Sequence, residues 1–430
     1  MKVNIVSLGC FKNLVDTERL LAMLCANGID AQVTEDPTLK ADAVIINTCG
    51  FIGDAKEESI NTILLAAQAK SRKRVKRIMV FGCLSERYPK DLAEQLPEVD
   101  SWHGKFNWPE IAQELCQGEL QAPKPERIIT TPSHHAYLKI SEGCNRFCAF
   151  CAIPLITGRM HSRTPEDIER EVRELVSRGV KEFNVIAQDL TGYGLDLPEG
   201  RHMLPELVDR LASIPGVEWL RLHYAYPADF PLDLMDSIAR HSNVCSYLDI
   251  ALQHISDPVL KNMRRHIDGA ATRRLIAQMR EKVPNLHLRT TLMVGFPGEG
   301  EAEFEELMDF VRETKFERMG AFAYCEEDDT YAAKHFTDSI PEEVKQERLD
   351  RLMALQESIS AEIQRQKVGK TLRVIVDDEE ADFYVGRTEW DSPEVDPQVL
   401  IHKTQKLNIG EFVNVKIEDA LDFDLIGTLV

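Results

Sequence analysis

The segment Ser141-Glu-Gly-Cys144-Asn-Arg-Phe-Cys148-Ala-Phe-Cys151 decides the fold and the chemistry that this sequence predicts. It places three cysteines in one short loop, directly after an apolar run that predicts a buried strand. Such close spacing lets one loop supply three thiolates to three irons of a [4Fe–4S] cluster, which leaves the fourth iron open to a small molecule. The alternative is structural zinc, which normally takes four protein ligands in two pairs, and no fourth ligand is evident nearby.

Strand and helix patterns alternate from this loop through the middle of the chain. They predict an open barrel of parallel strands with helices outside, a (β/α)6 arrangement short of the eight units of a closed barrel. The charged helix Pro341–Lys367 is expected to close this domain, which we place at residues 130–363. The predicted strands are Ala136–Ser141, Glu182–Ala187, Trp219–Tyr224, Tyr247–Leu252, His287–Val294 and Met319–Tyr324. Barrel enzymes carry their chemistry at the carboxyl ends of such strands, and the cysteine loop follows the first of them.

Residues 1–122 predict a separate α/β domain with a parallel sheet, because short apolar strands again alternate with helical patterns. Its predicted strands are Val3–Leu8, Ala43–Thr48 and Arg77–Gly82. The predicted helices include Leu14–Asn27 and Asp54–Lys70, and a Pro-containing polar linker, 121–127, follows the domain.

A second set of cysteines follows the three strands of this N-terminal domain. Cys10, Cys49 and Cys83 each come just after a strand, and the carboxyl ends of parallel strands meet at one edge, where ligands bind. Buried packing is the alternative, since free cysteine behaves as a small hydrophobe. Equivalent positions at three strand ends favour a second cluster with one open iron. The other cysteines, which we expect to be packing residues, are Cys25, Cys116, Cys245 and Cys325.

Residues 364–430 predict a small all-β barrel, because short strands are separated by turn residues. The predicted strands are Thr371–Val376, Phe383–Arg387, Phe412–Ile417 and Leu425–Val430. From residue 368 onward this part has six Lys or Arg against fourteen Asp or Glu, a net charge of −8. The whole chain has 51 Lys or Arg against 71 Asp or Glu, a net charge of −20. Such charge disfavours a polyanion and favours a cationic partner, although acidic residues can also serve solubility alone.

Cysteine use and hydropathy bear on the compartment. Ten cysteines in a long chain without a signal peptide predict metal or catalytic roles in the cytosol, where structural disulfides are rare. No apolar stretch has the length needed to span a bilayer, so no membrane contact is expected.

With both cysteine sets in view, the sequence resembles the radical S-adenosylmethionine methylthiotransferases along essentially its whole length. The first set matches the CxxxCxxC signature of the radical superfamily, and the terminal barrel resembles a TRAM domain, which is similar to an OB fold. Other stretches resemble the branch that modifies a ribosomal protein: Ser7-Leu-Gly-Cys10-Phe-Lys-Asn-Leu-Val-Asp16, Asn47-Thr-Cys-Gly-Phe-Ile52, Lys139-Ile-Ser-Glu-Gly-Cys144, Ala187-Gln-Asp189, and Tyr247-Leu-Asp-Ile250 with Gln253-His254.

The resemblance implies both a reaction and partners. It implies two [4Fe–4S] clusters, S-adenosyl-L-methionine as radical source and methyl donor, and an electron donor such as flavodoxin or ferredoxin. The implied substrate is an aspartate of small-subunit ribosomal protein S-twelve, free or in the assembled subunit, which gains a methylthio group at its β-carbon. The acidic terminal barrel makes transfer RNA unlikely, because tRNA binding needs basic surface. A tRNA-modifying enzyme of the same family and a non-enzymatic metal-binding protein are the alternatives.

Residues that contact S-adenosylmethionine are less sharply indicated. Gln188 and Asp189 stand at the end of the second barrel strand, where the superfamily often binds the cofactor amino group, although its usual Gly-Gly-Glu is absent. Gln253, Arg289 and Gly295 lie at or near later strand ends and are candidates for ribose, carboxylate and adenine. A purely structural role is an equal alternative for each. His254 and His266 are expected to be hydrogen-bonded scaffold.

Overall fold

The N-terminal part of the chain is built on a parallel sheet with strand order β2-β1-β3-β4-β5. The computed structural model describes residues 1–116 and 118–430. Successive side chains of β3 point to opposite faces, so Ile45 packs under α1 and α5, while Val44 and Ile46 pack under α2. The elements are β1 (Lys2–Ser7), α1 (Phe11–Ala26), β2 (Asp30–Val33), β3 (Ala41–Thr48), α2 (Gly53–Ser71), β4 (Val75–Gly82), α3 (Cys83–Arg87), α4 (Pro89–Gln95), β5 (Ser101–Trp102) and α5 (Trp108–Leu115).

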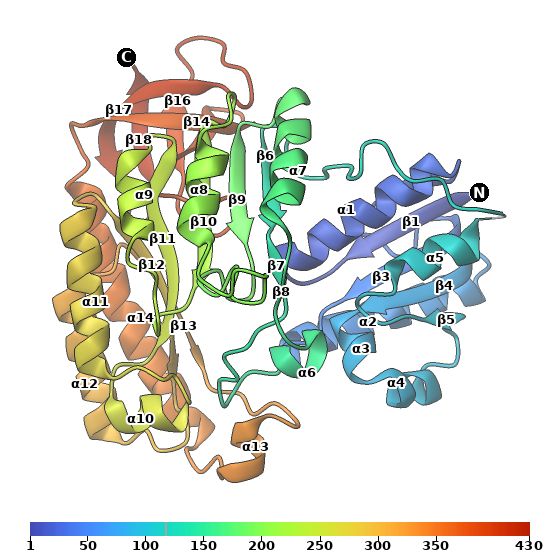
Figure 1. Ribbon diagram of the computed structural model, residues 1–430, viewed down its shortest axis with the longest axis horizontal. Helices are drawn as coiled ribbons and strands as arrows, with labels where there is room; N and C mark the ends of the chain where they lie inside the picture. Colours follow the sequence, from blue (N-terminus) through green and yellow to red (C-terminus); the bar gives the residue numbers. More distant parts are fainter. Residues whose placement is uncertain (117) are drawn as a thin grey trace.

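The middle of the chain forms an open barrel of six parallel strands in the order β13-β12-β11-β10-β9-β6. Its helices lie on the outer face and the long α14 closes one side (Figure 1). The strands are β6 (His135–Lys139), β9 (Glu182–Ile186), β10 (Trp219–Ala225), β11 (Val244–Gln253), β12 (His287–Val294) and β13 (Arg318–Ala323). The main helices are α7 (Pro165–Ser177), α8 (Leu204–Ala212), α9 (Leu234–Arg240), α11 (Gly269–Lys282), α12 (Glu301–Thr314) and α14 (Glu342–Arg365). Short elements after the strands are β7 (Ser141–Glu142), α6 (Ile153–Thr157), β8 (His161–Ser162), α10 (Asp257–Asn262) and α13 (Tyr331–His335).

The last strands close into a small barrel with the order β14-β15-β16-β18-β17. It sits over the amino ends of the large barrel's strands, the end away from the cysteine loop (Figure 1). A buried ion cluster joins the two, since Glu182 of β9 accepts hydrogen bonds from Arg387 at 2.7 Å and Arg221 at 3.1 Å. The strands are β14 (Thr371–Glu379), β15 (Phe383–Thr388), β16 (Val399–His402), β17 (Phe412–Ala420) and β18 (Leu425–Leu429).

This architecture confirms the predicted fold class, with a parallel α/β sheet, an open six-stranded barrel and a terminal β-barrel. The predicted bounds of His287–Val294 and Pro165–Ser177 match β12 and α7 at both ends. The sequence analysis missed β2, β5 and β16, all of four residues or fewer. Such short strands show too few alternations to be recognised without their sheet neighbours. Within the described residues, no helix combines the length and the hydrophobicity that crossing a membrane requires.

Candidate functional site

The loop with Cys144, Cys148 and Cys151 leaves the first barrel strand through a tight turn. Gly143 has φ +82°, and a Cβ there would lie 2.1 Å from the carbonyl oxygen of Arg159, so only glycine fits. The backbone then folds on itself, since Cys144 N–H donates to Gly158 at 3.2 Å and Cys151 N–H donates to Cys148 at 3.1 Å. These contacts fold the loop at the carboxyl end of the barrel, and all three of its cysteines are free thiols.

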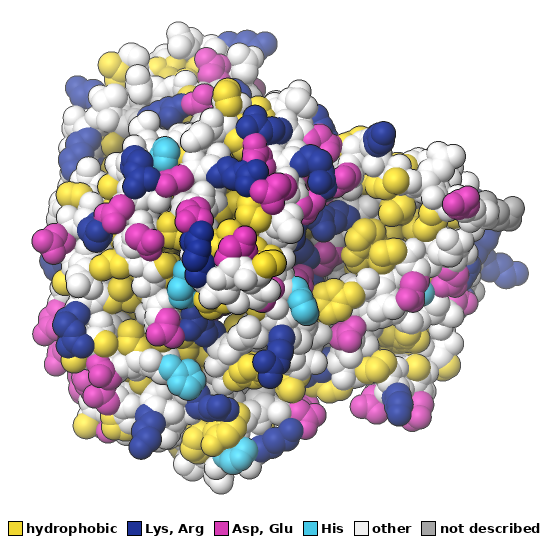
Figure 2. Space-filling view, viewed as in Figure 1, with side chains coloured by type: hydrophobic (Ala, Val, Ile, Leu, Met, Phe, Trp, Pro, Cys, Tyr) yellow, Lys and Arg dark blue, Asp and Glu magenta, His cyan; other side chains and the backbone are white. Residues whose placement is uncertain are grey.

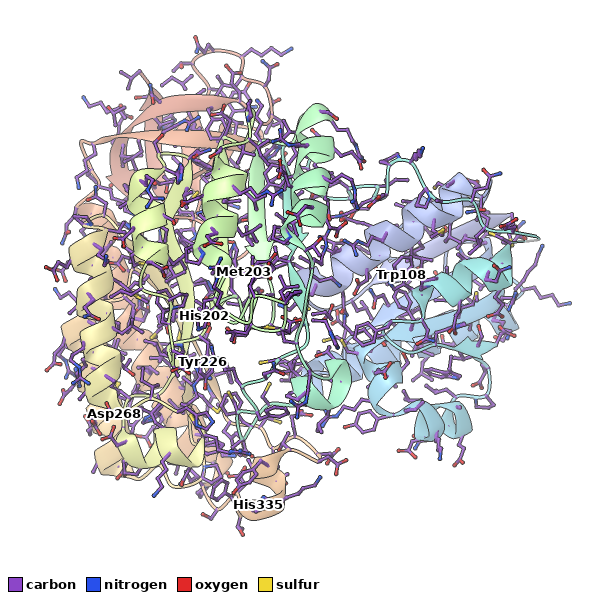
Figure 3. The ribbon with its side chains drawn as sticks, viewed as in Figure 1. Trp108, His202, Met203, Tyr226, Asp268 and His335 are labelled. Carbon is purple, nitrogen blue, oxygen red and sulfur yellow. The ribbon has the colours of Figure 1, made fainter. Side chains whose placement is uncertain are left out.

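Cationic and aromatic groups surround this loop. Arg265 donates to Cys148 Sγ at 3.2 Å, and its guanidinium lies 4.2 Å from the ring centroid of Tyr226. Tyr226, which follows β10, lies toward the carboxyl ends of the barrel strands, below His202 and Met203 in the view of Figure 3. Burial raises the pKa of the Cys144 thiol to about 12 and also raises the pKa of Cys151. Both thiols are therefore neutral here, and binding of iron would release their protons.

The second set lies at neighbouring strand ends of the N-terminal sheet. Cys10 follows β1, Cys49 follows β3 and Cys83 follows β4, and these three strands are adjacent. Their loops touch: a Cβ on Gly9 would lie 2.9 Å from Cys49 Sγ, and a Cβ on Gly50 would lie 2.8 Å from the carbonyl carbon of Cys83. The strand order reverses between β1 and β3, the point where α/β sheets bind ligands.

The pKa values of the three thiols in this second set are shifted in different directions. Desolvation by the surrounding protein raises the pKa of Cys10, but the ammonium groups of Lys12 and Lys105 outweigh it, so that the net pKa is lowered. Burial raises the pKa of Cys49, and it raises the pKa of Cys83 to about 12. Cys10 is exposed, whereas Cys49 and Cys83 are buried. Cys10 is therefore the thiol of this set that most readily becomes the thiolate which binds metal.

The two cysteine sets face each other across the junction of the two domains. Cys83 packs against Ala152 and Ile156, which follow Cys151 directly or lie in α6. The first residues of α1 enter the barrel, where the ring of Phe11 stacks on Tyr137 of β6 at 3.9 Å. In Figure 1, α6 lies between α3 and the barrel, which agrees with this packing.

A buried ionic network, here called the bridge, joins the domains between the cysteine sets. It comprises Asp16 and Lys105 of the N-terminal domain, and Lys139 and Glu142 of the barrel. Lys105 Nζ lies 3.0 Å from Asp16 and 3.8 Å from Glu142, and Lys139 Nζ contacts both carboxylates. Burial raises the pKa of Asp16, but the two lysines reverse this and lower it to about 2. Asp16 is therefore a carboxylate at neutral pH.

The predicted S-adenosylmethionine contacts at the second strand lie beside the cysteine loop. Asp189 is buried and accepts from Arg146 Nε at 2.7 Å and from the Thr191 hydroxyl at 2.6 Å. Gln188 donates to Glu142 of the bridge, and its Oε1 is buried without a partner among the described residues. The carboxylate of Asp189 is thus engaged within the protein, while Gln188 retains an acceptor for a ligand.

The other three candidates lie in different places. Gln253 ends β11 with φ +71°, and its buried Oε1 also has no partner within the described chain. Gly295 ends β12, and a Cβ there would lie 2.4 Å from Lys345 Cγ. Arg289 lies near the amino end of β12, and its Nε is 3.5 Å from Asp396 of the terminal barrel. Gln253 and Gly295 are therefore at the strand ends, whereas Arg289 contacts the opposite part of the molecule.

His254 is part of the scaffold. Its Nδ1 accepts the Ser256 N–H at 3.0 Å, so its Nε2 carries the proton and donates to Glu299 at 3.1 Å. Glu299 also accepts from the Gly295 N–H at 2.9 Å and from Arg348 at 2.8 Å. This agrees with the role expected of His254, and it fixes the loop after β12.

The sequence analysis assigned no role to Lys12, Lys105, Tyr226 and Arg265. Their types carry no metal-ligand signal, and their partners lie far away in the chain, so spacing could not reveal them. Among the residues that the structure describes, no three His, Cys, Asp or Glu side chains lie close enough together to hold a single metal ion. Each cysteine set nevertheless offers three free thiols, which is the donor chemistry of iron–sulfur clusters.

Comparison with protein families divides the chain in the same way as the fold. Residues 2–104 match the Uncharacterized protein family UPF0004, residues 138–311 match the Radical SAM superfamily, and residues 368–430 match the TRAM domain. Three full-length relatives carry the name ribosomal protein uS12 methylthiotransferase RimO. The relative from Parabacteroides distasonis is 57% identical over 100% of this chain and 99% of its own length. The relative from Porphyromonas gingivalis is 54% identical with the same coverage of both chains. The relative from Cytophaga hutchinsonii is 47% identical over 100% of this chain and 98% of its own length.

Solved structures show a similar fold. The radical S-adenosylmethionine methyltransferase TsrM from Kitasatospora setae aligns with a TM-score of 0.54 at 15% identity, covering 74% of this chain and 72% of that protein. The cobalamin-dependent radical enzyme OxsB aligns with a TM-score of 0.54 at 12% identity, covering 83% of this chain and 56% of that protein. At such low identity these alignments support the arrangement of strands and helices alone.

Proposed function

The chain belongs to the RimO family of ribosomal protein uS12 methylthiotransferases, and we propose that it adds a methylthio group to the β-carbon of an aspartate in that protein. It is a radical S-adenosylmethionine enzyme that uses this cofactor and a [4Fe–4S] cluster. Hydrogen on a carbon next to a carboxylate is not acidic enough for a side-chain base to remove at neutral pH. The reaction therefore requires a radical, and the protein supplies binding and orientation.

The first cluster belongs to Cys144, Cys148 and Cys151 in this proposal. With S-adenosylmethionine bound at its open iron, this group supplies the radical that removes hydrogen from the substrate. The protein's own residues hold the loop: Gly143 permits the turn, and Arg265 donates to Cys148. A guanidinium beside a cluster thiolate offsets its negative charge, which favours the reduced state.

The second cluster belongs to Cys10, Cys49 and Cys83. One observation carries this proposal: Cys83 packs against Ala152 and Ile156, immediately beyond the first set. Sulfur must meet the substrate radical before solvent does, so its site has to lie next to the first cluster. Three thiols at adjacent strand ends, with Cys10 activated by two lysines, suit a cluster that keeps one iron open for sulfur.

Roles for the remaining candidates follow from their positions. Gln188, Gln253 and Gly295 are proposed to contact S-adenosylmethionine, because they stand at the strand ends beside the first set and two of them carry unpartnered acceptors. Asp189 would act by fixing Arg146, to which it is paired. Arg289 remains a candidate only if the cofactor reaches further into the barrel. The proposed units are 1–122 for the second cluster, 130–363 for the radical barrel and 364–430 for the TRAM domain.

Partners beyond uS12 follow from charge and chemistry. Reduction of the first cluster calls for a low-potential donor such as flavodoxin or ferredoxin, in the cytosol where ribosomal proteins are found. Asp378, Glu379, Glu380 and Asp382 are exposed on the terminal barrel and are proposed to attract basic ribosomal protein surface. Asp377 does not belong to this set, because it pairs with Arg387 and His134 inside the molecule. On the face in Figure 2, acidic and basic side chains alternate, which does not favour a polyanion such as tRNA.

Reconstitution of the purified protein with iron and sulfide tests this function. Changing Cys144, Cys148 and Cys151 together to Ala should halve the bound iron and abolish 5′-deoxyadenosine formation. Changing Cys10, Cys49 and Cys83 should also halve the iron but leave 5′-deoxyadenosine detectable. Full iron in the second triple variant would show that the N-terminal site is wrong.

Mass analysis tests the substrate. The wild-type protein should add one methylthio group to an aspartate of uS12, and cells without the gene should lack that group while their tRNA nucleosides stay normal. Modified tRNA with unmodified uS12 would move the protein to the tRNA branch.

A further inference from the structure

Lys12 is a buried lysine at the junction of the two cysteine sets, and no carboxylate of the described residues pairs with its ammonium. The residue is 8% exposed, and no carboxylate oxygen of the described residues lies within 4.0 Å of its Nζ. Its one close contact of note is the ring of Tyr224, whose centroid lies 3.6 Å from Nζ. Other buried lysines, Lys105, Lys139 and Lys345, each pair with a carboxylate.

The position makes this cation costly. Lys12 is the second residue of α1, whose first turn contains no acidic residue. The amino end of a helix carries partial positive charge, so it favours an anion and disfavours a cation. Burying an ammonium without a partner costs further free energy. The chain is rich in carboxylates, with a net charge of −20, yet no carboxylate of the described residues pairs with Lys12.

The surroundings of Lys12 point toward the reaction centre. Cys10 lies two residues before it, and Tyr224, at the end of β10, belongs to the barrel. Phe11 is stacked on Tyr137 in the barrel, which fixes the start of α1 there. Lys12 is not fully enclosed, because 8% of its surface remains exposed. An anion that enters between the cysteine sets can therefore reach it.

We propose that Lys12 binds the side-chain carboxylate of the substrate aspartate and thereby sets the preference for an acidic side chain. The inference rests on the proposed function, since it names the group that recognises its substrate. A carboxylate at Lys12 would neutralise the buried ammonium and accept from the amino end of α1. Its β-carbon, one bond away, would then lie between the two cysteine sets, where hydrogen removal and sulfur addition must meet.

The test uses reconstituted holoenzyme and two peptides of the modified uS12 loop, one with Asp and one with Asn at the modified position. Binding is measured by calorimetry and modification by mass analysis. The wild type should bind the Asp peptide more tightly than the Asn peptide. Lys12→Met should weaken binding of the Asp peptide on the order of 100-fold, the scale for loss of one partner of a buried charge pair, and abolish the preference. Lys12→Arg should keep most of the preference.

A matched control is available in Lys367, a second buried lysine that pairs with no carboxylate of the described residues, which lies over Trp390 of the terminal barrel. Lys367→Met should leave both peptide affinities unchanged. The iron content of Lys12→Met is measured alongside that of Cys10→Ala, because Lys12 also neighbours this cysteine.

Two results would overturn the role of Lys12: an unchanged preference in Lys12→Met, or loss of iron equal to that of Cys10→Ala. A wild-type enzyme that modifies neither peptide nor intact uS12 would instead refute the proposed function.

Discussion

The Asp16 carboxylate of the bridge is expected to stabilise the folded protein and to hold the two cysteine sets together. Changing Asp16 to Asn keeps the shape of the side chain but leaves the ammonium groups of Lys105 and Lys139 with Glu142 as their remaining carboxylate. Asp16 titrates near a pKa of about 2 in the folded protein and near its ordinary 3.8 when unfolded. At pH values above both pKa values, that difference corresponds to roughly 2.5 kcal/mol of folding free energy.

The pH dependence has a definite sign. Because the folded pKa is lowered, the contribution of Asp16 is fully present above about pH 4 and is lost as the pH falls toward 2. In urea denaturation of metal-free protein, Asp16→Asn should therefore be less stable than wild type by roughly 2.5 kcal/mol at neutral pH. The gap should close as the pH falls through this window.

The same variant tests coupling between the cysteine sets. Loosening the bridge should lower the yield of methylthiolated uS12 per 5′-deoxyadenosine formed, because sulfur no longer meets the radical reliably. The control is Asp42→Asn, which breaks the exposed pair with Lys76 and should change neither quantity measurably. Equal stability of Asp16→Asn and wild type at neutral pH, or a gap that persists at the acid end, would refute the reasoning.

Three further predictions follow from other contacts. Glu182→Gln should destabilise the protein by about 3 kcal/mol or more, because Arg387 loses the charge of its buried partner, and limited proteolysis should then release the terminal barrel first. Arg265→Met should lower the reduction potential of the first cluster by on the order of tens of mV, seen in a redox titration followed by electron paramagnetic resonance, since Cys148 loses its cationic donor. Phe11→Ala should lower the free energy of unfolding of the metal-free protein by about 3 kcal/mol in urea denaturation. It should also lower the yield of methylthiolated uS12 per 5′-deoxyadenosine without changing the iron content.

The fold could be predicted wherever local signals were complete. Helix α7 was predicted at both ends from its helical pattern, and the structure shows local signals at its start, where Thr164 accepts the Asp167 N–H and Pro165 begins the helix. Strand β12 could be predicted because most of its eight residues are apolar or β-branched and Gly295 follows them. By contrast, β16 has four residues and exists by pairing with β15 and with β18, which follows it much later in the chain. A pattern within one segment cannot supply that information.

In the candidate site, too, some residues could be predicted from local sequence and others could not. The cysteines could be found because their identity and their position after strands carry the chemistry. The charged residues around them could not, because Lys105 acquires its meaning from Asp16 and Glu142, which approach it only in the folded chain. Arg289 was expected at or near the end of a late strand, but it is the third residue of β12, and its contact with Asp396 of the terminal barrel arises only in the folded chain.

The junction explains why the two cysteine sets must belong to one chain. A carbon radical formed at the barrel mouth reacts with whatever it meets first, so the sulfur site has to be held beside it. Several contacts hold the proposed sulfur site, among them Cys83 against Ala152, the bridge, Phe11 on Tyr137, and Arg87, which pairs with Glu327 at 2.7 Å across the same junction. In the proposed mechanism the moving part is the substrate loop, whose carboxylate would bind Lys12 between two fixed sites. Breaking any one contact should therefore reduce coupling before it reduces radical formation.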